Sequence, residues 1–452
     1  MTRASDLWLA VTTMLVSCGG IASPPPAEGV PPLSDDGASP SDSGAPPADA
    51  VSRPANEIRS EKMRNLAPVV SRDDAAQLAA DNLAFGLDLY GQLRVRSAGN
   101  FVFSQTSISL ALAMLYGGAA GNTAAQMAAA LHFTLPPERL HPAFDALDLA
   151  LRTPPAGADA NAFRLAIANS TWVQKGFAFL SSYLDLLAEN YDAGLFTEDF
   201  LSAPESARAD INRWVSEQTE HMIPELFHPG SIDWSTRLVL ANAVYFHGIW
   251  WDGFSPTSPD GVFHAPAGDV MVPMMSSPKN NAVLWGDVGW TCARLAYNGG
   301  TTSMILLVPD AGTFDAFEQG LTASSLAGIL APPSTTWGRL TMPRFKFSTA
   351  SLLASVLKQL GMSDAFDGDL ADFSGMDGAR DLSVSEVIHQ AVIAVDEQGT
   401  TAAAATGTTV GIVLVLVEEG QLLVVDRPFL FFIRHNPTGA ILFQGRVVDP
   451  SR

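Results

Sequence analysis

One segment constrains the fold of this chain more than any other, an uncharged run from Gly399 to Val417 with a strand-like stretch on either side. The run has no charged residue, no proline and no large aromatic residue. Loops normally run through solvent and are polar and rich in turn formers. Here the first part is small, with alanine at 402–405, and the last part is β-branched or apolar at 408–413. The composition predicts a segment that is exposed first and can become a buried strand later.

Side-chain alternation in this run favours the same interpretation, because successive side chains of a strand point to opposite faces. The even-numbered positions can all be buried without a charged partner: Thr400, Ala402, Ala404, Thr406, Thr408, Val410 and Ile412. Proline would remove a ladder donor, and none occurs. The residues alone leave three alternatives open: a helical turn at 402–405, a plain mobile loop, or part of a membrane span at 410–417. Gly407 opposes helix extension, and a span needs roughly 20 residues.

Composition limits the class of partner and the size of the fold. The chain has 452 residues, a formal net charge of -21 and 47% hydrophobic residues, which is enough for a large core. Length alone would allow two or three domains. The acidic balance argues against a nucleic-acid partner, for which a basic patch is expected.

The amino terminus predicts export. Arg3 precedes an apolar run at 7–16, and Leu15-Val16-Ser17-Cys18 resembles a bacterial lipoprotein box with Cys18 as the lipidated residue. The alternatives are an ordinary secretory signal that happens to contain a cysteine and a full membrane span, for which the apolar run is short. Residues 19–70, rich in Pro, Ser, Ala, Asp and Gly, predict a disordered tether. We therefore expect a signal peptide at 1–18, a tether at 19–70, one folded domain at 71–452, and a lipid-anchored or extracellular protein.

Motifs for catalysis or metal binding are not found. The sequence has no G-x-S-x-G elbow, no H-E-x-x-H, no phosphate-cradling glycine loop and no cysteine pair with zinc spacing. A Ser/His/Asp triad made from distant residues stays open. Cys292 is the only cysteine of the expected mature domain, in an apolar stretch, and we expect a buried packing residue there. The sequence predicts no enzyme, no cofactor and no metal.

Periodicity along the folded part predicts a mixture of helices and strands. Helices are expected at 75–95, from about 106, at 181–189, 204–222 and 348–361. Strands are expected at 167–173, 238–246, 337–347 and 382–395, with hairpins at 291–310 and 422–448. Helices come early and strands dominate later, which predicts an α+β fold with mainly antiparallel sheets.

Several blocks of the chain resemble the serpin family. D-E-Q-G-T-T-A-A-A-A at 396–405 resembles the hinge of the serpin reactive-centre loop, and 426–433 and 445–450 resemble the serpin carboxyl end. Residues 100–127 are similar to the shutter helix, with Gln105 where serpins usually have proline, and 242–250 resemble the segment with the breach tryptophan. The resemblance covers about 75–450. It implies the serpin fold, with about nine helices, three mainly antiparallel sheets and an exposed reactive-centre loop.

The same resemblance implies how the protein acts. A serine protease cleaves the exposed loop, and the loop inserts into the central sheet before the acyl-enzyme deacylates. Every candidate residue at the cut is aliphatic, which favours elastase-, subtilisin- or chymotrypsin-like proteases as covalent partners of a monomeric inhibitor. The alternatives are a non-inhibitory binding module with the serpin fold and a chain that is only cleaved as a substrate.

The resemblance also implies the site residues. Counting from Glu397 places the reactive bond at Val413-Leu414, and counting back from Pro428 places it near Val417. The breach residues are Trp250 and Arg344, the latter as the base that pairs with Glu397. The hinge residues are Glu397, Gly399, Thr400, Thr401, Ala402, Ala403, Ala404 and Ala405. The shutter residues are Ser104, Ser107, Asn242 and His389.

Overall fold

The computed structural model describes residues 56–153, 162–332, 334–400 and 421–452. All described residues belong to one compact unit, 54–452. Across these residues, no helix combines the length and the apolar character needed to cross a bilayer.

The described residues form ten α-helices, a short 3₁₀ turn at Asp364–Phe366 and nineteen strands. The helices are α1 (Arg72–Arg96), α2 (Gln105–Tyr116), α3 (Gly121–Ala130), α4 (Pro137–Arg152), α5 (Ser181–Tyr191), α6 (Pro204–Gln218), α7 (Phe314–Gly320), α8 (Ala323–Leu330), α9 (Ala354–Gln359) and α10 (Ser374–Asp377). The strands are β1 (Glu57–Ile58), β2 (Phe101–Phe103), β3 (Phe163–Gln174), β4 (Leu195–Glu198), β5 (Leu238–Ile249), β6 (Ser255–Pro256), β7 (Gly261–Ala265), β8 (Gly268–Val272), β9 (Met274–Ser276), β10 (Ala282–Asp287), β11 (Trp290–Ala296), β12 (Thr302–Pro309), β13 (Thr336–Pro343), β14 (Phe345–Leu352), β15 (Glu386–Val395), β16 (Gly399–Thr400), β17 (Gln421–Val424), β18 (Phe429–His435) and β19 (Ile441–Val447).

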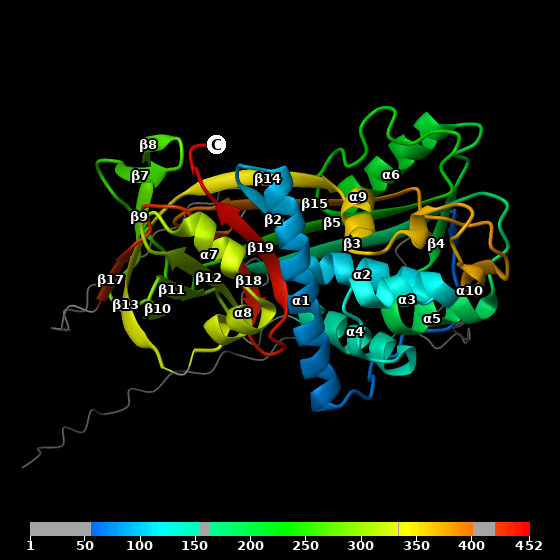
Figure 1. Ribbon diagram of the computed structural model, residues 1–452, viewed down its shortest axis with the longest axis horizontal. Coiled ribbons are helices and arrows are strands. Elements are labelled where there is room, and N and C mark those ends of the chain that lie inside the picture. Colours follow the sequence, from blue (N-terminus) through cyan, green and yellow to red (C-terminus); the bar gives the residue numbers. More distant parts are fainter. Residues whose placement is uncertain (1–55, 154–161, 333, 401–420) are drawn as a thin grey trace, which may run out of the picture. The chain divides into compact units, whose positions relative to one another are not determined.

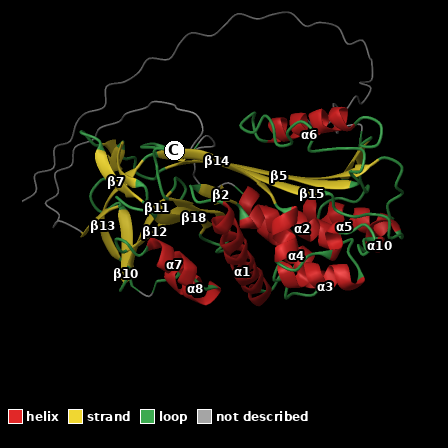
Figure 2. Cartoon of the chain, turned by 45° about the horizontal axis from the view of Figure 1, so that its top comes forward, coloured by secondary structure: helices red, strands yellow, loops and turns green. Residues whose placement is uncertain are grey.

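A seven-stranded sheet, in the order β1-β4-β3-β5-β16-β15-β14, forms the centre of the domain. Residues 238–246 of β5 are all buried, which is typical of a strand covered on both faces. Figure 2 shows α6 on one face of this sheet and α2 to α5 on the other. Trp172, Phe196 and Ile211 pack in a separate hydrophobic cluster that includes α6 residues, while the main core takes in the other helices.

A ten-stranded sheet makes up the other half of the domain, in the order β2-β19-β18-β12-β11-β10-β13-β9-β6, with β17 paired to β13. In Figure 1 its strands lie to one side of α1, and α7 and α8 lie beside them. Phe429–Ile433 are five consecutive buried residues of β18, an interior strand of this sheet. The strands β7 and β8 form a two-stranded hairpin of their own. The α+β class and the mainly antiparallel pairing predicted from the sequence are confirmed.

One expected helix is wrong in its first half. Residues 348–352 continue β14 as a strand, and only 354–359 form a helix. Ser348 lies opposite Val392 and Leu352 opposite Ile388 of β15, so pairing with a long neighbouring strand overrides the local helix propensity. The first arm of the hairpin expected at 422–448 is also two strands, β17 and β18, separated at 425–428.

Residues 56–65, which the sequence prediction assigns to the tether, contact the domain; we call them the amino-terminal strap. Glu57 and Ile58 pair with β4 at the edge of the central sheet. Arg64 reaches the carboxylates of Asp145 and Asp148 on α4, at 2.7 and 2.8 Å. All three of these side chains are less than a tenth exposed. The strap therefore closes one edge of the sheet and neutralises two buried carboxylates.

Candidate functional site: the opening of the central sheet

The central sheet is closed along most of its middle and opens at one end. Strands β5 and β15 pair in parallel from Val239 and Glu386 to Tyr245 and Val392. Beyond that point β16 lies between them, with Gly399 opposite Ile249 and Thr400 opposite both Gly248 and Val395. The first two residues of the uncharged run therefore already occupy the gap between the two strands.

A tight turn brings the chain from β15 into this gap. The Asp396 carboxylate accepts hydrogen bonds from the backbone N–H groups of Gln398 (2.9 Å) and Gly399 (3.2 Å). The Asp396 N–H donates to the Gly399 carbonyl at 2.9 Å. A Cβ atom at position 399 would collide with the Gly248 carbonyl oxygen, so the close approach of the two backbones requires glycine here.

Trp250 covers the entrance to the gap. Its indole is 2% exposed, stacks on Tyr297 with ring centroids 4.5 Å apart, and donates from Nε1 to the Asp396 carbonyl at 2.9 Å. Tyr297 and Thr400 share a hydroxyl–hydroxyl hydrogen bond of 2.6 Å. Burial raises the pKa of Tyr297, so its phenol stays neutral and can bond the Thr400 side chain. Thr400 is 1% exposed and points into the core.

Arg344 and Glu397 form an ion pair at the rim of the same opening. Their side chains are 41% and 18% exposed, so water screens much of their attraction. The Glu397 carbonyl accepts from the Phe254 N–H at 2.8 Å. The structure thus brings the predicted breach residues Trp250 and Arg344 together around the predicted hinge residues Glu397, Gly399 and Thr400.

A buried polar network crosses the closed part of the sheet beneath α2. Asn242 on β5 and His389 on β15 lie in register, and both are completely buried. The Ser104 N–H donates to His389 Nε2 at 3.0 Å, so Nδ1 carries the imidazole proton and donates to Asn242 Oδ1. Burial lowers the pKa of His389 to about 3, which keeps the ring neutral.

The Asn242 amide links this pair to the helix. Its Nδ2 donates to the carbonyl and hydroxyl of Ser107, at 2.9 and 2.7 Å, and to Asn169 Oδ1. Ser104 caps the start of α2 by accepting from the Ser107 N–H at 3.2 Å. All four predicted shutter residues therefore lie in one hydrogen-bonded network.

Two members of the site were missed from the sequence. Asn169 of β3 completes the polar row across β3, β5 and β15, because it pairs in register with Asn242. Tyr297 anchors Thr400 from the turn between β11 and β12. The polar residue inside the predicted strand at 167–173 was the available signal for Asn169; no comparable signal marked Tyr297.

Several predicted positions lie outside the described residues. They are Cys18, Thr401, Ala402, Ala403, Ala404, Ala405, Val413, Leu414 and Val417. Cys292 is described, and it is a free, fully buried cysteine whose thiol pKa burial raises, as expected for a packing residue. Within the ranges that the structure describes, no cluster of three or more His, Cys, Asp or Glu could hold a metal ion.

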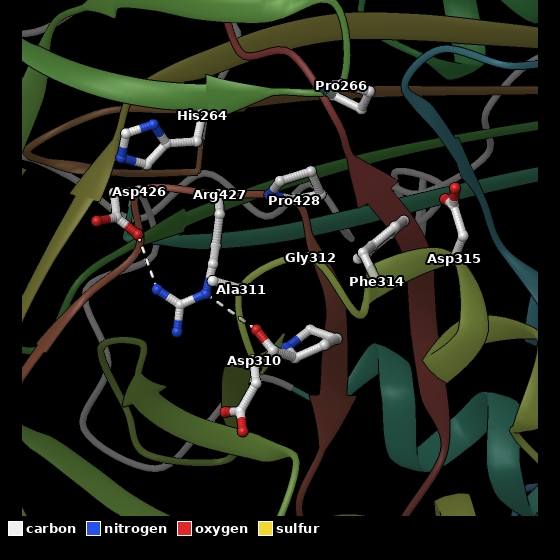
Figure 3. Close-up of a pocket in the computed structure, with 11 residues that line it drawn as sticks. His264, Pro266, Asp310, Ala311, Gly312, Phe314, Asp315, Asp426, Arg427 and Pro428 are labelled. Atoms are coloured by element: carbon white, nitrogen blue, oxygen red, sulfur yellow. Dashed lines mark hydrogen bonds and ion pairs between the residues drawn. The ribbon is translucent and has the colours of Figure 1, made fainter.

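A cavity of about 380 Å³ lies where β7, β12 and β18 meet, and none of its lining residues belongs to the predicted site. Figure 3 shows Arg427 beside it, donating to Asp426 Oδ1 at 2.8 Å and to the Pro309 carbonyl at 3.0 Å. The bond to the Pro309 carbonyl ties the segment before β18 to the end of β12.

Comparison with known proteins decides the family. A family model described as serpin (serine protease inhibitor) matches residues 80–450. The chain belongs to the serpin family. This serpin is 40% identical to the leukocyte elastase inhibitor of Bos taurus over 385 residues, 83% of this chain and 100% of the relative. It is 35% identical over 369 residues to an uncharacterized serpin-like protein of Thermococcus kodakarensis, covering 81% of this chain and 84% of that protein.

Solved structures give the same fold. The native state of the thermophilic serpin tengpin superposes with a TM-score of 0.74 at 27% sequence identity, over 87% of this chain and 97% of that one. The serpin described here therefore has the fold that the sequence resemblance implies.

Proposed function

We propose that this serpin inhibits serine proteases as a suicide substrate, and that the opening between β5 and β15 is the site into which its cleaved loop inserts. The observation that carries the proposal is the position of β16. The chain after β15 turns back, places Gly399 and Thr400 antiparallel to both neighbouring strands, and continues into an uncharged run.

The register of β16 predicts where the inserted loop will lie. Thr400 is opposite Gly248 on one side and Val395 on the other. Six residues further along the same antiparallel register, Thr406 falls between Asn242 and His389. Insertion then replaces the direct Asn242–His389 hydrogen bond by contacts with a threonine hydroxyl, so the buried polar groups keep a partner. The even-numbered residues, which share the inward face with Thr400, need no charged partner there.

The chemistry is that of an interrupted hydrolysis. The protease serine attacks the carbonyl at the reactive bond, Val413-Leu414 or near Val417, and forms an ester while the amine of the following residue leaves with a proton. Insertion then carries the ester-linked protease along the sheet. From Thr400 to Val413 an extended strand covers about 44 Å, at about 3.4 Å per residue, which displaces the protease before water completes the second step.

The aliphatic residues at 413–417 support elastase-, subtilisin- or chymotrypsin-like enzymes as targets. Curated relatives at this level of similarity carry the name leukocyte elastase inhibitor. We also propose that the protein is exported and held by a lipid on Cys18, in the manner of bacterial lipoproteins, and acts as a monomer. The support is the tetrapeptide ending at Cys18 and the tether-like composition that follows it.

Incubation with elastase or subtilisin tests the inhibitory function. We expect a covalent complex that survives denaturing electrophoresis, together with a carboxyl-terminal fragment that mass spectrometry assigns to a cut between 413 and 418. Complete cleavage with no complex would reject trapping and leave a substrate with the serpin fold.

A further inference from the structure

Three large apolar side chains are exposed together at the edge of the ten-stranded sheet. Trp337 and Leu422 are each 60% exposed, and Val424 is 37% exposed. Strand β17 pairs in parallel with β13, with Arg339 opposite Leu422. Side chains alternate along both strands, so Trp337, Leu422 and Val424 share one face while Leu340 and Leu423 are buried on the other. We call Trp337, Leu422 and Val424 the edge patch.

The edge patch has the composition of a protein contact surface. Single exposed apolar residues are common, but a contiguous group on an edge strand is a binding site or a liability. Arg339, directly opposite Leu422, is a charged side chain on this face, and its Nε donates to Ser276 Oγ at 3.0 Å and to the Ser277 carbonyl at 3.3 Å. Its guanidinium is thereby held against the domain. Tryptophan is also the residue most enriched at the energetic centres of protein interfaces.

The position of β17 identifies the occupant. Its first residue, Gln421, lies seven positions after Leu414, so the reactive bond is at most about 24 Å from β17 along an extended chain. A compact domain of about 200 residues has a radius of gyration of about 16 Å. A protease with its active-site serine on the reactive bond therefore lies within reach of the end of the domain that carries the edge patch.

We infer that the edge patch is a docking surface for the target protease, contacted while the intact loop occupies the active-site cleft. This inference rests on the proposed function. The matching partner is a serine protease with an apolar surface beside the part of its cleft that binds residues after the cut. Cleavage separates Val413 from Leu414, so the protease leaves with the inserting loop while the edge patch stays behind. The patch thus sets the rate of association and has no effect on the outcome after cleavage.

Kinetics with Trp337→Ala test this assignment. With elastase or subtilisin we expect the second-order rate constant for reactive-loop cleavage to fall about tenfold, the effect of losing about 1.4 kcal/mol of contact. The number of inhibitor molecules consumed per covalent complex should stay unchanged. Leu422→Ser should act in the same direction. A synthetic peptide of residues 407–421 lacks the edge patch, so its cleavage rate gives the rate for the loop sequence alone.

Trp234→Ala provides the matched control. Trp234 is 66% exposed and lies just before Leu238, at the end of β5 opposite to the hinge, so its removal should leave the rate unchanged. Equal rates for the Trp337 and Trp234 variants would overturn the docking surface. The docking surface would also be overturned if sedimentation showed a wild-type dimer and a monomeric Trp337→Ala variant, because the patch would then bind a second copy through β17. The test measures cleavage, so it remains valid if no covalent complex forms. The absence of a complex would reject trapping of the protease but not the docking surface.

Discussion

His389 donates from Nδ1 to Oδ1 of Asn242 across the line along which the central sheet must part. The hydrogen bond lies in a network that includes α2 and β3 and is buried except for the half-buried Asn169, so the network holds the closed sheet together. A buried network in which every polar group has a partner specifies one arrangement and opposes any opening that leaves those groups unpaired.

Removing the Asn242 side chain should weaken this network. Asn242→Ala leaves the buried His389 Nδ1–H without its partner, while the Ser107 hydroxyl keeps Asn169 Oδ1, and we expect the free energy of unfolding to fall by about 1–3 kcal/mol. Urea unfolding of the intact protein checks this. Asn436→Ala is a suitable control, because its amide also bonds a backbone carbonyl and a serine hydroxyl but does so at the surface of the β11–β12 turn. An Asn242 variant as stable as the wild type would contradict the role of the network.

Protonation of the buried histidines should destabilise the fold in mild acid. Burial lowers the pKa of His389 to about 3 and that of His141 to about 4, below the value of about 6.5 expected in the unfolded chain. The unfolded state therefore binds more protons between those values. Stability should be full above about pH 6.5 and fall as the pH drops, by up to about 1.4 kcal/mol per pH unit for each histidine.

Substitution separates the two histidines. His141→Gln should reduce the slope of stability against pH between 6 and 4.5 by up to one histidine's share. Among the described residues, the His141 ring forms a hydrogen bond with the Tyr191 hydroxyl at 2.6 Å. Urea midpoints measured at pH 7, 6 and 5 give that slope. If the urea midpoints of wild type and variant change with pH in parallel, His141 is charged in the folded protein in this pH range and its assigned neutral state is wrong.

Thr400 should control whether the loop can insert. Its side chain is buried against Tyr297, so Thr400→Arg would bring a charge with no carboxylate partner into the gap, at a cost of several kcal/mol. We expect the variant to be cleaved at the wild-type rate but to form little covalent complex on a denaturing gel. Thr401→Arg is the control, because alternation in an inserted strand would turn that side chain away from the inward face of Thr400. Equal trapping by both arginine variants would contradict insertion in this register.

The amino-terminal strap should stabilise the domain through Arg64. Breaking a buried ion pair by removing one partner costs about 3–5 kcal/mol, and Arg64 serves two carboxylates that are 0% and 3% exposed. Arg64→Leu should therefore lower the free energy of unfolding by that amount in urea titrations. In a background with Asp145→Asn and Asp148→Asn the same change should cost far less. A uniform penalty in both backgrounds would assign the effect to packing.

The rim pair of Arg344 and Glu397 should contribute little to stability. Both groups contact water, and exposed ion pairs contribute about 0–1 kcal/mol. A double-mutant cycle with Arg344→Gln and Glu397→Gln, followed by thermal unfolding, should give a coupling energy in that range. A coupling above about 2 kcal/mol would show that the pair, and not the Trp250–Tyr297 stack, holds the hinge in place.

The sequence predicted the residues of this site better than it predicted their partners. Trp250 and Asn242 could be placed because they belong to the block at 242–250 that resembles serpins, and Arg344 and His389 because the same resemblance implies them. Asn169 could not, because its role depends on the register between β3 and β5, which no local pattern specifies.

The sequence-based prediction was also wrong at two places. Residues 348–352 were predicted as the start of a helix, yet they pair with β15. The amino-terminal strap was assigned to the tether by its composition. Its contact through Arg64 with two buried carboxylates produces no hydrophobic periodicity that a sequence could show.

A structure of the chain cut at the reactive bond tests the central claim most directly. The account predicts residues 400–412 as a new strand between β5 and β15, with Thr406 between Asn242 and His389. If β5 and β15 were still paired to each other from 239 to 245 and from 386 to 392 in the cut chain, the account would be contradicted.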